Sequence, residues 1–378
     1  MNRPILISTV GTSLFKGNLE PLVKGKKEDL PFNHEKISRY FKEKSFKQLA
    51  SELRKLEGSD RICGAEINTI NEILKLRDIN PQNIIFLVSD TKDGENTGTV
   101  LKEYFSELKN SGIKNVDFKK IKGLQTEDPV KFQRKGLTNL VKEIGEIIQS
   151  YGSENIAVDA TGGYKAQIAI AVVIGQALSI PVYYKHEFFN RIIDFPPMPV
   201  SLDYSLLGDN ASLFHQLETN EILENAGTDL YDEKIDIFLE KTSVDNKEII
   251  ALSPIGHVYL TAFRILNPKR PENLIDSSNR KEPSFGKGHH LPSGFKKYIN
   301  KIWQENSWIS QIITLDYSGQ KGLKNQGVFV SDKGNNHYEL RGVYKGNDEF
   351  SGKFQIITET ASKTDLTWAA DRLNKKYF

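Results

Sequence analysis

Short runs of aliphatic and β-branched residues alternate with helical stretches through the first 200 residues, and this alternation constrains the fold more than any other feature. Strands that are buried on both faces read as continuous apolar runs of roughly four to eight residues. Mainly apolar runs cover residues 5–10, 84–89 and 156–159, and residues 116–121 are expected to form a further strand. The intervening helical patterns predict an α/β fold in which a parallel sheet carries helices on both faces.

The chain changes character after residue 200, at a Pro-Pro-Met-Pro cluster (196–199). With 378 residues, and roughly 150 residues per domain, two or three domains are expected. Residues 205–266 carry 4 basic and 11 acidic side chains, whereas residues 267–378 carry 18 and 12. We therefore expect a first domain over 1–200, an acidic helical or winged-helix-like connector over 201–290, and a small basic α+β domain over 291–378.

The composition excludes several classes of protein. The single cysteine, Cys63, cannot form an internal disulfide, which suits a reducing compartment. The N-terminus lacks the pattern of a signal peptide, and no run of about 18 apolar residues is present. One cysteine and a lone pair, His289 and His290, give no zinc pattern. These features predict a cytoplasmic protein without a metal or other cofactor.

Polar turns follow three of the expected strands. The strongest is Asp-Ala-Thr-Gly-Gly-Tyr-Lys (159–165), and the others are Gly-Thr-Ser (11–13) and residues 90–94. Glycines let the backbone approach a phosphate, and a following helix presents free N–H groups. One such turn could be purely structural, but three at the carboxyl ends of parallel strands predict a phosphate-bearing ligand. The turns match neither GxGxxG nor GxxxxGK[ST], which disfavours an ordinary dinucleotide or NTP site.

The strand and turn Ile-Leu-Ile-Ser-Thr-Val-Gly-Thr-Ser-Leu (5–14), paired with Asp-Ala-Thr-Gly-Gly-Tyr-Lys-Ala-Gln (159–167), resembles the CRISPR-associated Rossmann-fold (CARF) domain. The resemblance implies a Rossmann-like sensor over residues 1–200 that forms a homodimer and binds cyclic oligoadenylate, with cyclic tetra-adenylate the expected form. The residues it implies for the ligand are Thr9, Gly11, Thr12, Ser13, Asp90, Thr91, Thr161, Gly162, Gly163, Lys165 and Gln167. Asp159 is interpreted as a turn former. Lys165 is also a candidate for cleaving the ring, so a ring nuclease stays open as an alternative.

The C-terminal region lacks the signatures of two common nuclease effectors. No Arg and His occur at the spacing of a HEPN ribonuclease, and no Asp and Glu-x-Lys set suggests a PD-(D/E)xK nuclease. Its order is a basic helix (295–303), strands over 328–330, 338–344 and 354–358, and a closing helix. This order resembles a RelE-type mRNA interferase, which implies metal-independent cleavage of mRNA on the ribosome.

The residues expected to catalyse this reaction are Arg341, Lys333, Lys363 and Tyr338. Attack by the RNA 2′-hydroxyl needs proton transfer and stabilisation of a dianionic phosphorane, which clustered basic and phenolic groups supply. We expect Arg341 to stabilise the transition state and the lysines to donate a proton or bind phosphate. Tyr338 and Trp368 are candidates to stack a base.

Each of these residues also has a structural interpretation. Arg341 could form a surface ion pair, the lysines a solvated basic face, and Trp368 part of the core. His289, His290 and His337 are interpreted as incidental.

The combined prediction is a type III CRISPR ancillary effector in which cyclic oligoadenylate activates an endoribonuclease and inhibits translation. A ligand-responsive DNA-binding regulator is a further alternative, although the net charge of −7 over residues 205–266 argues against contact with DNA.

Overall fold

The computed structural model describes residues 3–27, 29–76, 79–186, 189, 191–224, 233–244, 247–286, 291–315, 326–345, 351–359 and 361–378. The chain divides into two compact units. The first contains residues 1–201 and 257–265, and the second contains residues 202–256 and 266–378. The connector expected over 201–290 is thus shared between the two units.

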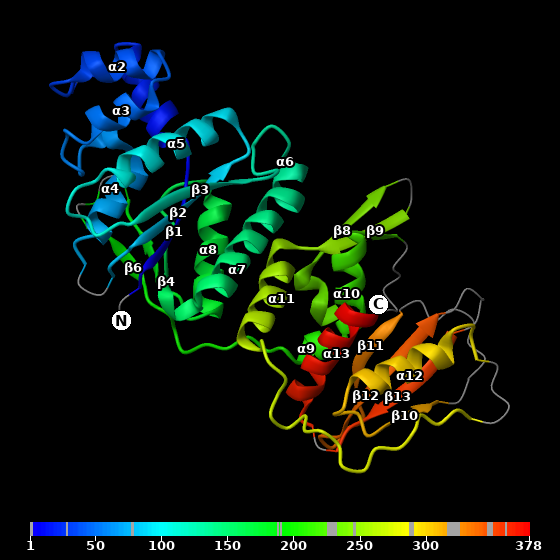
Figure 1. The fold of residues 1–378 in the computed structure, drawn as a ribbon. Helices are drawn as coiled ribbons and strands as arrows, with labels where there is room; N and C mark the ends of the chain where they lie inside the picture. The colour runs from blue at the N-terminus through cyan, green and yellow to red at the C-terminus, as the bar shows by residue number, and fades with distance from the viewer. Residues whose placement is uncertain are drawn as a thin grey trace. The chain divides into compact units, whose positions relative to one another are not determined.

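The first unit is built on a six-stranded sheet with the order β3-β2-β1-β4-β5-β6 (Figure 1). All neighbouring strands are parallel except β5 and β6, which are antiparallel. The strands are β1 (Ile5–Thr9), β2 (Asn83–Ser89), β3 (Asn115–Ile121), β4 (Ile156–Asp159), β5 (Val182–Tyr184) and β6 (Ile193–Phe195). The predicted parallel sheet is therefore confirmed, and its strand order is that of a Rossmann-like fold.

Helices cover both faces of this sheet, which explains why its central strands β1, β2 and β4 are buried almost throughout. Leu6 and Phe86 belong to one hydrophobic cluster with residues of η1, α3, α4 and α5, while their neighbours Ile7 and Leu87 are buried on the other face. The helical segments of this unit are η1 (Ser13–Leu19), α1 (Glu20–Val23), α2 (His34–Lys42), α3 (Phe46–Leu53), η2 (Arg61–Cys63), α4 (Gly64–Ile73), α5 (Lys92–Ser106), α6 (Pro129–Lys131), η3 (Phe132–Leu137), α7 (Thr138–Tyr151), η4 (Ser153–Asn155) and α8 (Lys165–Ala177).

The second unit begins with a small helical and antiparallel region. Its elements are α9 (Ser205–Asp209), α10 (Ala211–Asn220), β7 (Leu223–Glu224), η6 (Glu233–Phe238), β8 (Leu239–Val244), β9 (Lys247–Leu252) and α11 (Pro254–Leu266). The strands form a sheet of order β7-β9-β8. Residues 257–265 of α11 belong to the first unit. η6 is a 3-10 helix that leads directly into β8.

A four-stranded antiparallel sheet of order β10-β13-β12-β11 forms the rest of the second unit (Figure 1). Its elements are α12 (Phe295–Glu305), β10 (Gln311–Thr314), β11 (Gly327–Asp332), β12 (Tyr338–Lys345), β13 (Ser351–Ile357) and α13 (Lys363–Tyr377). The α+β character is as predicted, but β10 was not anticipated. Phe295 of α12 packs on Phe354, and the amide of Asn374 in α13 hydrogen-bonds both the N–H and the C=O of Val328 at the edge of β11.

Candidate functional site

The predicted ligand-binding turns meet where the strand order of the sheet reverses. The chain moves outward through β2 and β3 on one side of β1, and through β4 and β5 on the other. Ligands of open α/β sheets bind outside the carboxyl ends of the strands at such a point. The turns after β1 and β4 are therefore adjacent, as the site requires.

Asp159, at the end of β4, links strand β1 to the turn that follows β4. Its carboxylate accepts hydrogen bonds from Ser8 Oγ at 2.7 Å and from the backbone N–H of Thr161 at 3.0 Å. The side chain is completely buried, and this burial raises its pKa from 3.8 to about 7. The bond to Thr161 is that of a turn former, as the sequence suggested.

Glu66 of α4 is a second buried carboxyl group at the site, and the sequence analysis did not identify it. Its oxygens accept hydrogen bonds from the N–H of Gly11 at 2.8 Å and from Ser13 Oγ at 3.4 Å. Burial raises its pKa, and its charge contributes to raising the pKa of Asp159. A signal was present in the sequence, because Glu66 lies on the same apolar face of α4 as Ile70 and Ile73.

Three glycines allow the two turns to pack against each other and against Glu66. A Cβ at Gly11 would lie 2.8 Å from the backbone nitrogen of Gly163, and one at Gly162 would lie 2.1 Å from Glu66 Oε1. Gly163 has φ of +103°, which L side chains rarely adopt. We call Gly11, Gly162 and Gly163 the glycine cluster.

A pocket of about 320 Å³ opens beside the glycine cluster, on the side of β2 and β3. We call it the β1–β2 pocket. It is lined by Thr12, Lys16, Thr91, Lys92, Asp93, Thr126, Glu127 and Tyr164. Lys16 and Asp93 form an ion pair at 3.2 Å within it, and the Tyr164 ring contacts Phe132 edge-on. Hydroxyl and ammonium groups thus face one space together with the carboxylates of Asp93 and Glu127, and the hydroxyl and ammonium groups are the ones suited to phosphate.

The predicted binding residues divide into two groups. Thr12 and Thr91 line the β1–β2 pocket, and Lys165 is exposed at the first turn of α8. Thr9, Asp90 and Gln167 instead hold the turns in shape: Thr9 donates to the carbonyl of Gly162 at 2.6 Å.

Asp90 accepts from the N–H of Gly123 at 2.9 Å, and the buried Gln167 accepts from that of Tyr164 at 2.6 Å. Thr161 is held in the same way, because its hydroxyl accepts from the N–H of Lys185 at 3.0 Å. These contacts place the residues next to the site without directing their side chains into the pocket.

In the second unit, Arg341 and Lys333 converge on one carboxylate. Arg341 lies in the middle of β12 and hydrogen-bonds Glu339 at 2.8 Å, and Lys333 lies 3.8 Å from the same carboxylate. His337 also approaches it at 3.8 Å. The Arg341 side chain retains 31% of its exposure. This is a compact group of cations around one acidic residue.

Tyr338 and Lys363 form a separate pair. The Lys363 ammonium lies 5.3 Å from the centre of the Tyr338 ring and pairs with Asp209 at 2.9 Å. Because side chains alternate along a strand, Tyr338 shares the face of the buried Leu340, whereas Glu339 and Arg341 point to the opposite face. The structure thus does not bring the four predicted catalytic residues into one cluster.

Trp368 is a core residue of the second unit. It is buried in α13, and its indole N–H donates to the carbonyl of Asn267 at 3.2 Å. His289 and His290 lie outside the described residues. Within the described ranges, no three or more His, Cys, Asp or Glu side chains are grouped to hold a metal ion. The same part of the chain has no helix with the length and apolar character of a membrane span.

The first unit thus has a Rossmann-like sheet with a polar pocket at its switch point, the general form of a nucleotide-binding domain. Residues 61–198, which include β2 to β6 of this sheet, match the model of a family described as CRISPR-associated protein (Cas_APE2256). No curated protein sequence matches the chain.

Two solved structures were found to be similar over most of the chain. One is Can2 from Sulfobacillus thermosulfidooxidans in complex with cyclic tetra-adenylate, with 10% identity and a TM-score of 0.25 over 96% of this chain and 75% of that chain. The other is protein VC1899 from Vibrio cholerae, with 9% identity and a TM-score of 0.24 over 94% and 77%. At these TM-scores the two structures do not establish a shared fold, and the architecture rests on the strand order given above.

Proposed function

We propose that the protein is a CRISPR-associated sensor and effector that binds cyclic oligoadenylate in its first unit and cleaves RNA with its second. The observation that carries the sensor function is the convergence of the turns after β1, β2 and β4 on one polar pocket, within a sheet whose residues 61–198 match a CRISPR-associated family. The expected ligand is cyclic tetra-adenylate.

The chemistry of the site supports an anionic ligand with several phosphates. Lys16 and Lys92 border the β1–β2 pocket, and Lys165 lies at the N-terminal end of α8, where free N–H groups add partial positive charge. The glycine cluster lets the ligand backbone approach closely. A cyclic oligonucleotide with two-fold symmetry would make the same contacts with each subunit of a homodimer.

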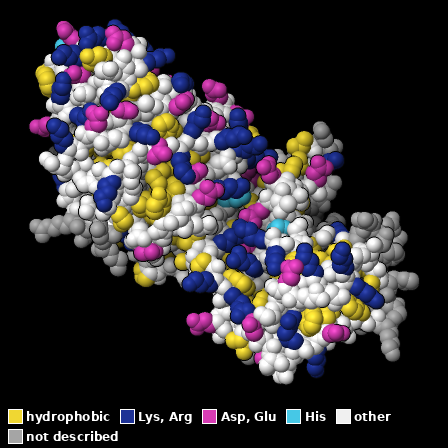
Figure 2. Space-filling view, viewed as in Figure 1, with side chains coloured by type: hydrophobic (Ala, Val, Ile, Leu, Met, Phe, Trp, Pro, Cys, Tyr) yellow, Lys and Arg dark blue, Asp and Glu magenta, His cyan; other side chains and the backbone are white. Residues whose placement is uncertain are grey.

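The outer face of α8 supports a homodimer. This helix is almost wholly apolar, yet Val173 on it is 37% exposed. The exposed Met198 lies beside the same helix, because the backbone N–H of Met198 donates to Gln176 of α8 at 2.8 Å. Phe195 and Val200 extend the exposed apolar surface. Figure 2 shows hydrophobic side chains gathered on the face of the first unit that the view presents. A second copy of the chain would bury this surface.

The effector function rests on Glu339 and the three side chains that approach its carboxylate, Arg341, Lys333 and His337. In metal-independent RNA cleavage, Glu339 would take the proton of the 2′-hydroxyl, and Arg341 would bind the phosphate and stabilise the developing dianion. Lys333 would donate a proton to the leaving oxygen. Phe329 and Gln355 flank Arg341 on the neighbouring strands and are half-buried, which gives RNA a polar and aromatic surface on that face. We propose mRNA on the ribosome as the substrate.

Activation requires that the ligand binds two arrangements of the protein with different affinity. The test is RNA cleavage by the full-length protein in a translation extract, with and without cyclic tetra-adenylate. Arg341→Ala should abolish cleavage and leave ligand binding intact, whereas Lys165→Ala should weaken the response to ligand. Lys24→Ala is the matched control, because Lys24 is exposed and its ion pair is with Glu20, four residues earlier in the chain. Cleavage that is indifferent to the ligand would refute the proposal.

A further inference from the structure

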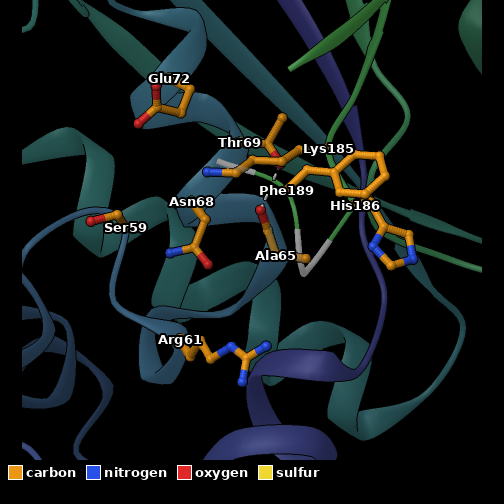
Figure 3. A pocket seen from close by; sticks show the side chains of 9 residues that line it. All are labelled: Ser59, Arg61, Ala65, Asn68, Thr69, Glu72, Lys185, His186 and Phe189. Atoms are coloured by element: carbon orange, nitrogen blue, oxygen red, sulfur yellow. Dashed lines mark hydrogen bonds between the residues drawn. The ribbon is translucent and has the colours of Figure 1, made fainter. Parts of the chain in front are cut away.

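A second pocket, of about 390 Å³, lies on the other side of the switch point and contains none of the predicted site residues. We call it the α4–β5 pocket, because residues of α4 form one wall and Lys185, His186 and Phe189, which follow β5, form the other (Figure 3). The side chains that matter most here are Arg61, Asn68, Glu72, Lys185, His186 and Phe189.

Both walls of this pocket are attached to the glycine cluster. The backbone N–H of Lys185 donates to Thr161 Oγ1 at 3.0 Å, in the turn after β4. Two residues before Asn68 on α4, Glu66 accepts from the N–H of Gly11, in the turn after β1. The α4–β5 pocket and the β1–β2 pocket therefore flank the same pair of turns.

The pocket presents hydrogen-bond acceptors that the protein does not use. Both N–H groups of the Asn68 amide are bonded, to the carbonyls of Gly58 at 2.6 Å and Asp60 at 2.9 Å. This fixes the amide, and its oxygen has no partner among the described residues. One oxygen of Glu72 pairs with Lys75 at 2.7 Å, and the other is likewise unpartnered within the described ranges.

The opposite wall presents a cation and an aromatic surface. The ammonium of Lys185 makes no ion pair with any described residue, and Figure 3 shows its side chain extended across the pocket. The rings of His186 and Phe189 lie 4.9 Å apart, and Phe189 is 48% exposed. An aromatic face of this kind stacks nucleobases.

We infer that the α4–β5 pocket binds one adenylate unit of the cyclic ligand, as a base-binding subsite distinct from the β1–β2 pocket. The base stacks on Phe189, its amino group donates to Asn68 and Glu72, and the adjoining phosphate pairs with Lys185. Two acceptors favour an edge that carries an amino group, as in adenine, over one that carries a carbonyl at the same position, as in hypoxanthine.

This inference rests on the proposed sensor function and deepens it. The two pockets then hold different parts of one ligand, the base at the α4–β5 pocket and phosphate at the β1–β2 pocket.

The test is isothermal titration of the full-length protein with cyclic tetra-adenylate. Phe189→Ala should weaken binding by about tenfold or more because it removes the stacking surface for the base. Lys185→Met should weaken binding by about tenfold or more because it removes the cation that pairs with the phosphate. Both side chains are partly exposed and the backbone bond of Lys185 is kept, so thermal unfolding should be unchanged. Lys24→Met serves as the control. Affinities equal to that of the wild type would overturn the inference.

A further arm addresses the base. Cyclic tetra-inosinate, which lacks the amino groups, should bind the wild type at least tenfold more weakly, and Glu72→Met should narrow that difference. Equal binding of the inosinate would refute the subsite. Absence of any binding to the wild type would instead refute the proposed function itself.

Discussion

Replacing Asp159 by Asn tests whether the buried carboxyl group at the switch point sets the pH dependence of stability. The amide can keep both hydrogen bonds: its oxygen accepts from the N–H of Thr161, and its NH₂ donates to Ser8 Oγ in place of the present bond. The substitution is nearly isosteric, so it changes the charge at this position and little else.

The magnitude follows from the pKa of Asp159, which burial raises from 3.8 to about 7. A difference of about three in pKa corresponds to about 4 kcal/mol. Because the folded state binds the proton more tightly than the unfolded state, the stabilisation is fully present below about pH 4 and is lost as the pH rises to about 7. Between pH 5 and pH 8, the wild type should lose about 2.5 kcal/mol relative to Asp159→Asn.

The assay is urea unfolding of both proteins at pH 5, 6, 7 and 8. All three tryptophans, Trp303, Trp308 and Trp368, lie in the second unit, so tryptophan fluorescence reports that unit alone. Far-UV circular dichroism reports both units. The transition seen only by circular dichroism should carry the pH-dependent difference, and the fluorescence transition should be the same in the two proteins.

A constant difference between the two proteins from pH 5 to pH 8 would refute the reasoning. It would mean that Asp159 is already ionised at pH 5 in the folded protein. Glu66, whose pKa is also raised by burial, is present in both proteins and therefore does not produce the difference by itself.

Two other substitutions test the packing inside each unit. Gly162→Ala should destabilise the first unit by about 1–3 kcal/mol and weaken ligand binding, because its Cβ would meet Glu66 and the carbonyl of Thr9. Gly17→Ala is the control, because its Cβ would have nothing closer than 3.9 Å. In thermal unfolding the control should be neutral or stabilising. Equal melting temperatures for the two variants would contradict the close approach. Asn374→Leu should lower the stability of the second unit by about 2–4 kcal/mol in tryptophan-monitored urea unfolding, since it removes both buried bonds to Val328, and an unchanged midpoint would show that those bonds contribute nothing.

Much of the first unit could be predicted because its signals are local. An apolar run followed by a polar turn defines the end of a strand wherever it occurs, and the turns after β1, β2 and β4 were found in this way. The alternation of side chains along β12 also predicts that Tyr338 and Arg341 cannot belong to one cluster. Tyr338 and Arg341 are three residues apart, so in a strand they must point to opposite faces.

A parallel sheet with polar turns at its strand ends and a basic α+β region follow from the sequence alone, because strand length, glycine turns and charge are properties of short segments. Which turns meet follows from the fold, because neighbours in a sheet are set by strand order and not by distance along the chain. That order places β4 beside β1 and brings Glu66, from a helix between them in sequence, against both turns. It also creates the α4–β5 pocket from two segments more than a hundred residues apart.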